Sequence, residues 1–183
     1  MNAVISPCNQ YRYRLDREVA AEGKVIAYFG VNPSYADASI DDNTITRMRS
    51  FTLSHQGKRF IVGNVFSYRS TDVSKLASTD DCFGLEHHFY LNQIINEADI
   101  LVPCWGSRNK LPQNLHQHLD SMLKLLLSSG KPVYSFGLTA TGDPRHPLML
   151  AGSTKLVPWE DKLICHTISQ HAAKKNATRL TSI

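Results

Sequence analysis

The chain has 183 residues, of which 42% are hydrophobic, 20% charged and 9% aromatic. These proportions are typical of a single globular domain of ordinary size, and they exclude a disordered chain, a collagen and a long coiled coil. Twenty Lys and Arg residues against 16 Asp and Glu give a formal charge of +4, which suits a polyanionic partner better than a cationic one.

Hydrophobic patterning and turn residues predict strands that alternate with helices along the chain. Residues 11–15 alternate in the way that is typical of a half-exposed strand. Continuous apolar runs that stop at turn residues predict buried core strands, and apolar residues at helical spacing predict the helices between them. The expected core strands are 25–31, 59–66, 100–104 and 133–136, and the expected helices are 44–56 (capped by Asp42 or Asn43), 73–76, 84–98 and 113–129.

This alternation predicts a three-layer α/β/α fold with a central, mainly parallel four-stranded sheet, to which the strand at 11–15 is added. We expect one α/β domain over residues 1–183, with its core at about 6–150 and a C-terminal extension at about 151–183. No apolar run is long enough to span a membrane, and residues 1–13 lack the charged start and apolar core of a secretory signal. These features predict a cytoplasmic protein.

The cysteines and histidines argue against a metal or cofactor. Four cysteines are far apart with no Cys-x-x-Cys pair, which predicts free thiols in a reducing compartment: Cys8, Cys82, Cys104 and Cys165. Neither a Gly-rich Rossmann fingerprint nor a Walker loop is present. The histidine pairs at 87–88 and 116–118 are not spaced to share one helix face, so we expect no cofactor and no metal site.

Polar or turn-forming residues follow each of the four expected core strands. Asn32-Pro33-Ser34 follows the first, Asn64 closes the second, Trp105-Gly106 follows the third, and His146-Pro147 lies in the loop after the fourth. Ligands of open α/β sheets bind outside the carboxyl ends of the strands. We therefore expect the four clusters to meet at one edge of the sheet.

Two asparagines at this edge have either a ligand-binding or a structural interpretation. Gly30 permits close backbone approach and Pro33 keeps Asn32 out of the helical region, so the Asn32 amide is free to hold a water or a ligand. The alternative is a turn asparagine that bonds its own backbone. The Asn64 carboxamide, at the end of an apolar strand, suits the edge of a nucleobase, or it fastens the following loop.

The segment 47–75 carries six Lys and Arg residues against a single Asp, with four aromatic residues interleaved. Such a mixture suits phosphate contact and base stacking, and the alternative is a solvated basic face over an ordinary core. Arg47, Phe66 and Arg69 are its candidate substrate-binding residues.

His146 lies in a rigid Gly- and Pro-containing loop, where it is either a hydrogen-bond donor to a developing oxyanion or an ordinary loop histidine. Asp37, Asp41 and Asp42 form an acidic cluster just after the Asn-Pro-Ser turn. One of them polarises a water, or they cap the next helix, which is the favoured interpretation of Asp42.

Two family resemblances extend this interpretation. The sequence resembles an uncharacterised bacterial and phage family, domain of unknown function 1643, from Ser6 to about Leu150. The matching motifs are Ser6-Pro-Cys8 with Tyr11-Arg-Tyr13, Asn32-Pro-Ser34 with Ala36-Asp37, Asp42-x-Thr44-x-x-Arg47, Asn64-Val-Phe66 with Arg69-Ser-Thr71, Trp105-Gly106 and Gly142-x-Pro144-x-His146-Pro-Leu148.

More distantly, the ordered set Gly30-Val-Asn32-Pro33, Asn64, Trp105-Gly106 and His146-Pro147 is similar to the motifs of the uracil-DNA glycosylase superfamily. That resemblance implies the superfamily's fold. It also implies that Asn32 orients the attacking water, Asn64 reads an extruded base and His146 stabilises the leaving base, with Leu148 or Met149 as a wedge. The candidate catalytic residues are thus Asn32, His146 and Asp37, and the candidate substrate-binding residues are Gly30, Pro33, Ser34, Tyr35, Asn64, Phe66, Arg47, Arg69, Trp105 and Leu148.

Three functions are compatible with these residues. The first is an N-glycosylase-like enzyme that flips a modified or damaged base out of DNA and hydrolyses its glycosidic bond. The second is a hydrolase or transferase that acts on free nucleotides or nucleosides. The third is a non-catalytic module that binds nucleic acid or protein on the same scaffold. The first two predict DNA or a nucleotide as the partner.

Overall fold

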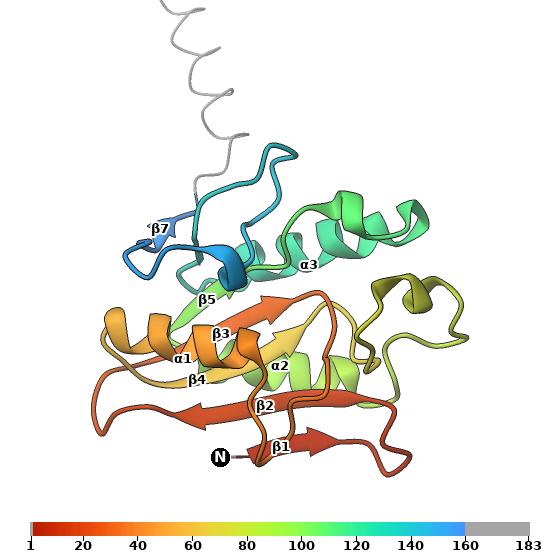
Figure 1. Ribbon diagram of the computed structural model, residues 1–183, viewed down its shortest axis with the longest axis horizontal. Coiled ribbons are helices and arrows are strands. Elements are labelled where there is room, and N and C mark those ends of the chain that lie inside the picture. The colour runs from red at the N-terminus through yellow and green to blue at the C-terminus, as the bar shows by residue number, and fades with distance from the viewer. Residues whose placement is uncertain (1, 160–183) are drawn as a thin grey trace, which may run out of the picture.

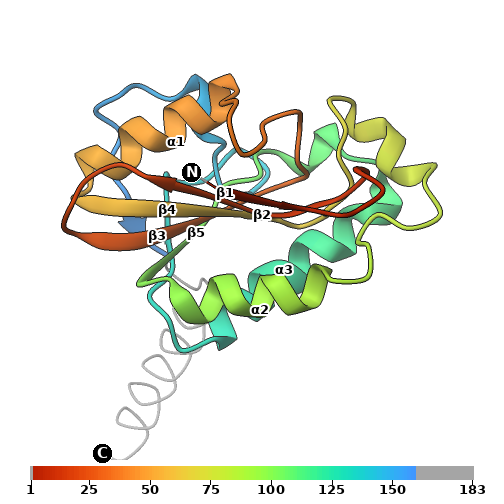
Figure 2. The same ribbon diagram turned by 90° about the horizontal axis from the view of Figure 1, so that it is seen from below.

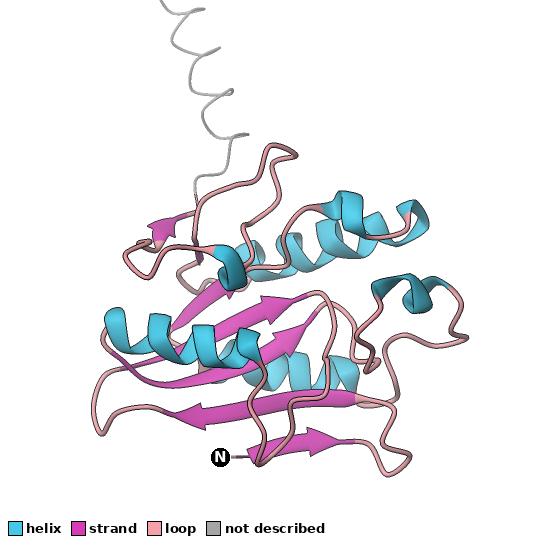
Figure 3. Cartoon of the chain, in the orientation of Figure 1, coloured by secondary structure: helices cyan, strands magenta, loops and turns pink. Residues whose placement is uncertain are grey.

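The computed structural model describes residues 2–159, which form a mixed α/β fold around a five-stranded sheet (Figures 1 and 3). The strand order is β1-β2-β4-β3-β5. Strands β3, β4 and β5 are parallel to one another, whereas β1 and β2 add to β4 in antiparallel fashion. The strands are β1 (Asn2–Ile5), β2 (Arg12–Glu18), β3 (Lys24–Gly30), β4 (Gly57–Asn64) and β5 (Ile100–Pro103).

Helices cover both faces of this sheet, with α1 on one face and α2 and α3 on the other (Figure 2). The α-helices are α1 (Asn43–Ser54), α2 (His87–Glu97) and α3 (His116–Ser128), and short 3-10 turns are η1 (Val73–Ala77), η2 (Arg108–Lys110), η3 (Gln113–Leu115) and η4 (Pro147–Met149). Asp42 caps α1 by accepting a hydrogen bond from the Ile45 amide, as the sequence predicts. Because both faces are covered, β3 is apolar and buried from Val25 to Gly30.

The expected four-stranded, mainly parallel sheet is wrong in two respects. Strand β1 was not expected, and together with β2, which is antiparallel to β4, it makes the sheet mixed. The expected strand at 133–136 contributes only a bridge between Val133 and Leu101. Its next residues, β6 (Tyr134–Ser135), pair with β7 (Val157–Pro158) in a separate two-stranded sheet, because the chain beyond residue 151 returns alongside them.

Two arginines of β2 are buried, whereas a half-exposed strand would leave such charged side chains on its solvent face. Arg12 and Arg17 are buried, since the loop that precedes α1 lies over them. The pairing of β1 with β2 skips Tyr13, with Val4 opposite Arg14 and Ile5 opposite Arg12. Such a β-bulge reverses the alternation of side chains, so the Arg12 side chain points to the same face as that of Arg17.

Residues 151–159 pack onto the fold through β7 and through Leu156, whose amide donates to His55 Nε2. The remainder of the expected C-terminal extension, with Cys165, lies outside the described residues. The other three cysteines carry free thiols. Within residues 2–159, no helix is long and apolar enough to cross a membrane. The cellular compartment stays a prediction.

Candidate functional site

A cavity of about 500 Å³ opens at the carboxyl ends of the parallel strands. Val31 follows β3, Trp105 and Gly106 follow β5, and His146 and Leu148 enter from the later loop. The rest of the lining combines apolar side chains with hydroxyl and cationic ones: Val73, Leu111, Leu119, Met149, Leu150, Ser107, Thr139, Arg108, Lys110 and Arg145. An apolar cavity with a few polar groups is the usual form of a site for a small aromatic ligand.

The hydrogen bonding of His146 fixes the chemical character of its imidazole. Its Nδ1 lies 3.3 Å from the Leu148 amide and accepts that hydrogen bond, so the neutral ring carries its proton on Nε2. Among the described residues, Nε2 has no hydrogen-bond partner. Burial lowers the pKa of His146, with a further contribution from the charge of Lys110 and an opposing one from Asp42. His146 is therefore a neutral Nε2–H donor at the cavity.

The loop that carries His146 is fastened to the loop after β5. The Gly106 amide donates to the Pro144 carbonyl (2.8 Å), and the buried Asp143 carboxylate accepts from both the amide and Nε of Arg108 (2.9 Å each). Gly106 has a φ of +81°, and a β-carbon there would lie 3.3 Å from His146 Cβ. A glycine is thus required for the close approach of the two loops. Sequence reasoning missed Asp143 as a positioning residue, although it lies inside the quoted Gly142–Leu148 motif.

Trp105 also lines this cavity, although its indole N–H is not exposed to it. Its indole Nε1 is buried and has no hydrogen-bond partner within the described part of the chain. An orphaned buried N–H costs about 1–3 kcal/mol.

The carboxamide of Asn32 is oriented by backbone carbonyls. Its Nδ2 donates to the carbonyls of Ser70 (2.8 Å), Pro33 (3.2 Å) and Tyr68 (3.3 Å). Three carbonyls around one end identify that end as the NH₂ group, so Oδ1 points the other way as an acceptor. The turn interpretation is therefore correct for Pro33 but incomplete, because the bond to Ser70 fastens two loops that are 38 residues apart. Asn32 does not line the large cavity itself.

Asn64 ends β4 directly beside Gly30, its partner in the parallel register. It is buried, and no hydrogen bond to its carboxamide is found among residues 2–159. Its Oδ1 lies 3.0 Å from the position that a β-carbon on residue 30 would take. Gly30 thus leaves room for this carboxamide at the same edge of the sheet, although Asn64 also lies outside the lining of the large cavity.

Three other predicted residues line a second, smaller cavity of about 330 Å³. Ser34, Tyr35 and Arg69 meet there with Asn9, Tyr68, Ser70, Thr71 and Lys75. Segments 31–35 and 70–75 contribute residues to both cavities: Val31 and Val73 face the large one, whereas Ser34 and Lys75 face the small one. Of the sequence-predicted residues, the large cavity therefore takes Trp105, His146 and Leu148, and the small one takes Ser34, Tyr35 and Arg69. Asn32 and Asn64 line neither cavity.

The loop between Pro33 and α1 is held by buried arginines of β2. Arg12 Nη1 donates to the Ala36 carbonyl (2.7 Å), and Arg17 pairs with Asp41 (2.6 Å). Asp37 Oδ1 accepts from the amides of Ser39 (2.8 Å) and Ile40 (2.9 Å), which lowers the pKa of Asp37. This oxygen of Asp37 is thus engaged within its own loop, and the predicted role in polarising a water is untested.

The remaining predicted residues have mainly structural contacts. Phe66 is fully buried against Phe83 and His118, so it presents no face for a base to stack on. Arg47 donates to the Leu150 carbonyl and joins α1 to the end of the His146 loop. Pro33 is buried beneath the Asn32 turn.

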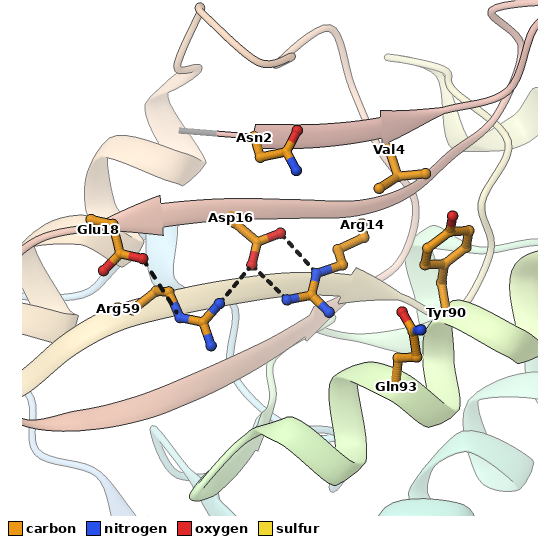
Figure 4. A pocket seen from close by; sticks show the side chains of 8 residues that line it. All are labelled: Asn2, Val4, Arg14, Asp16, Glu18, Arg59, Tyr90 and Gln93. Atoms are coloured by element: carbon orange, nitrogen blue, oxygen red, sulfur yellow. Dashed lines mark hydrogen bonds and ion pairs between the residues drawn. The ribbon is translucent and has the colours of Figure 1, made fainter.

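The basic segment 47–75 does not form a single surface. Arg59 lies on the sheet beside α2, where it pairs with Asp16 (3.3 Å), Glu18 (3.7 Å) and Glu97. Figure 4 shows this cluster lining a third cavity of about 370 Å³, in which Arg14 also pairs with Asp16 (2.7 Å). Arg49 pairs with Asp41. The basic residues that are neighbours within segment 47–75 thus lie on different parts of the fold.

Titratable groups do not gather into a metal site. Within residues 2–159, no group of three or more His, Cys, Asp or Glu side chains could hold a metal ion.

Comparisons with known proteins identify one family. The model of a family described as "protein of unknown function (DUF1643)" matches residues 12–148, from β2 into η4. The match includes the lining of both cavities except Asn9, Met149 and Leu150. No curated protein matches the chain, and no solved structure matches it.

Proposed function

This chain belongs to the DUF1643 family of proteins of unknown function, and we propose that it is an N-glycosylase-like hydrolase that acts on a base flipped out of DNA. The observation that carries the proposal is the neutral His146 donor, which faces an apolar cavity at the carboxyl edge of the sheet. We further propose that β4, β3 and β5, with helices on both faces, form a uracil-DNA glycosylase-like core.

In this mechanism the base enters the large cavity and packs beside Trp105. As the bond between C1′ and the base nitrogen breaks, its electron pair goes to the base, and His146 Nε2–H donates a hydrogen bond to the oxygen on which negative charge develops. A neutral imidazole suits this step because its Nε2–H is a hydrogen-bond donor at neutral pH, so the ring does not first have to gain a proton.

Water supplies the new bond to C1′. Asn32 Oδ1 accepts a hydrogen bond from this water and aims its lone pair at the sugar, because Nδ2 is already held by three carbonyls. One proton of the water finally reaches the departed base through solvent, which balances the reaction. We assign the reading of the base edge to Asn64, whose donor and acceptor groups have no protein partner among the described residues. Because Asn64 lies at the same edge of the sheet but outside the cavity lining, this role requires the base to reach beyond that lining.

The test is the formation of abasic sites. Oligonucleotides that contain uracil or substituted pyrimidines, in single and double strands, are incubated with the protein and then cleaved with alkali. His146→Ala should slow cleavage about 10²- to 10³-fold, as expected for the loss of one preorganised donor. Asn32→Ala should slow it as well, whereas His88→Ala, an exposed histidine on α2, should not. If no substrate gives abasic sites, or if His146→Ala cleaves normally, the proposal is wrong.

The size of the large cavity favours a second candidate, a hydrolase or transferase for free nucleosides or nucleotides. At about 500 Å³ the cavity lies within the range for complete small-molecule ligands. Release of free base from nucleosides, without activity on oligonucleotides, would favour this candidate. Salt-dependent DNA binding without any turnover would instead favour a non-catalytic module.

A further inference from the structure

The smaller cavity has a chemical character that differs from that of the larger one. Its lining contains two cationic side chains, Arg69 and Lys75, and no Asp or Glu side chain takes part in it. Hydroxyl groups complete the lining, among them those of Ser34 and Thr71. Guanidinium, ammonium and hydroxyl groups are together the usual ligands of a phosphate oxygen.

The cations of this cavity are not neutralised by ion pairs within the described chain. Arg69 donates through Nη1 to the Asn9 side chain and backbone carbonyl, which leaves Nε and Nη2 available. Two carboxylates lie near enough to feel these charges, because Arg69 contributes to the lowered pKa of Asp37 and Lys75 to that of Asp72. Neither carboxylate forms a direct ion pair with them in residues 2–159: Asp37 accepts from its own loop, and Asp72 accepts from the Ser74 amide (2.9 Å) and hydroxyl (2.7 Å). The charges of Arg69 and Lys75 therefore remain available to an anion.

A third positive charge lies beneath the same loop. Arg12 is 3% exposed and donates to the carbonyl of Ala36, next to Tyr35 in the lining. It has no carboxylate within ion-pair distance in residues 2–159, and its Nε has no partner. Burial lowers the pKa of Arg12 to about 10, against the opposing charges of Asp42 and Asp37 and with further contributions from the charges of Arg69 and Arg17. A buried guanidinium in these surroundings makes the overlying cavity attractive to an anion.

We propose that the cavity lined by Ser34, Arg69, Thr71 and Lys75 is a binding site for a phosphate group. It lies across the 31–35 and 70–75 segments from the larger cavity, and Asn32 fastens these two segments through the Ser70 carbonyl. A nucleotide unit would place its base in the large cavity and a phosphate in the small one. The assignment of this phosphate to a nucleotide rests on the proposed function, whereas the anion site itself does not.

The test uses the full chain and two phosphate sources. Fluorescence anisotropy measures binding of a short labelled oligothymidylate over a range of NaCl concentrations, and calorimetry measures binding of thymidine 5′-monophosphate, with thymidine as the phosphate-free probe. The double variant Arg69→Gln/Lys75→Gln is compared with Lys24→Gln/Lys124→Gln, which also removes two exposed positive charges but far along the chain from this cavity. Circular dichroism confirms that both variants fold.

We expect Arg69→Gln/Lys75→Gln to weaken binding of a phosphate-containing probe about tenfold or more. For the oligonucleotide, the slope of log K against log salt should fall by about one. The control variant should change neither quantity comparably. An effect on the oligonucleotide assigns the site to a backbone phosphate, and an effect on the monophosphate alone assigns it to a free nucleotide.

Three results would each overturn the site. The first is an equal loss of affinity in the double variant and the control variant, and the second is no binding of either phosphate probe. The third is equal affinity for thymidine and its monophosphate, with no effect of the double variant on oligonucleotide binding. If phosphate binding depends on Arg69 and Lys75 but no glycosidic bond is cleaved, the proposed function fails and the phosphate site stands.

Discussion

The burial of His87 makes the stability of this protein depend on pH in a calculable way. His87 lies on α2, is 5% exposed, and has its Nδ1 2.8 Å from the Ser67 hydroxyl. Burial, with a smaller contribution from the neighbouring His88 and an opposing one from Asp81, lowers the pKa of His87 from 6.5 to about 4. The folded protein therefore keeps this imidazole neutral down to about pH 4.

The direction in which stability changes with pH follows from proton linkage. Between pH 6.5 and pH 4 the unfolded chain binds a proton at residue 87 that the folded state does not, so the free energy of unfolding falls as the pH falls. At about 1.4 kcal/mol per pH unit, this interval amounts to about 3 kcal/mol. That loss is a substantial part of the stability of an ordinary domain.

The perturbation is His87→Asn, which keeps an acceptor near the position of Nδ1 but does not titrate. Urea unfolding, followed by tryptophan fluorescence, gives the free energy of unfolding of both proteins between pH 7 and pH 4. The variant should be less stable at pH 7, because the smaller asparagine side chain leaves part of the buried site empty. As the pH falls to 4, the parent protein should lose about 3 kcal/mol of unfolding free energy that the variant keeps. The stability of the variant relative to the parent should therefore rise by that amount.

The control is His88→Asn, which removes an exposed histidine from the same turn of α2. It should keep most of the pH dependence, since burial is the largest cause of the lowered pKa. Parallel curves for the parent protein and His87→Asn would refute the reasoning, because they would show that residue 87 does not bind the extra proton on unfolding.

Two further predictions concern the candidate site. Asn32→Asp places an oxygen against the Ser70 and Tyr68 carbonyls, which should lower the free energy of unfolding by about 2 kcal/mol at pH 7. Those carbonyls raise the pKa of the new carboxyl, so thermal unfolding should show a smaller deficit at pH 5 than at pH 8, and an equal deficit would contradict the amide orientation. Gly30→Ala places a β-carbon 3.0 Å from Asn64 Oδ1 and should abolish base release while shifting the midpoint of thermal unfolding by only a few degrees. Gly152→Ala, which meets nothing within 4 Å, is the matched control, and normal base release by Gly30→Ala would count against a role for Asn64.

Local sequence signals were sufficient for the helices and for the three central strands. Asp42 caps α1 as predicted, and the continuous apolar run at 25–31 forms β3 because both of its faces are covered. These features depend on neighbours within a few residues, or on burial alone. Strand β1 was missed because four residues give too short a pattern, and its partners in β2 lie seven to 14 residues further on.

The site was predicted less completely than the fold, because its contacts join segments that are distant in the sequence. Nothing near Arg12 indicates burial, since the β-bulge and the covering loop that cause it depend on β1 and on residues 36–41. Asp143 attracted no attention for the same reason: its partner Arg108 is 35 residues away.

The sequence by itself determined the helices, the three central strands, their order, and the positions of the polar residues that follow those strands, because periodicity, turn residues and caps act over short distances. Its charge excess of +4 and the dense basic segment within it also indicated a polyanion. Only the tertiary structure decided where those charges lie. Packing of α2 against the sheet brings Arg59 to acidic partners, whereas Arg69 and Lys75 stay without ion pairs in the described chain and share a cavity with hydroxyl groups. A cationic side chain stays available to a ligand only where the fold brings no acidic side chain into contact with it. The spacing of residues along the chain does not show which acidic side chains those contacts involve.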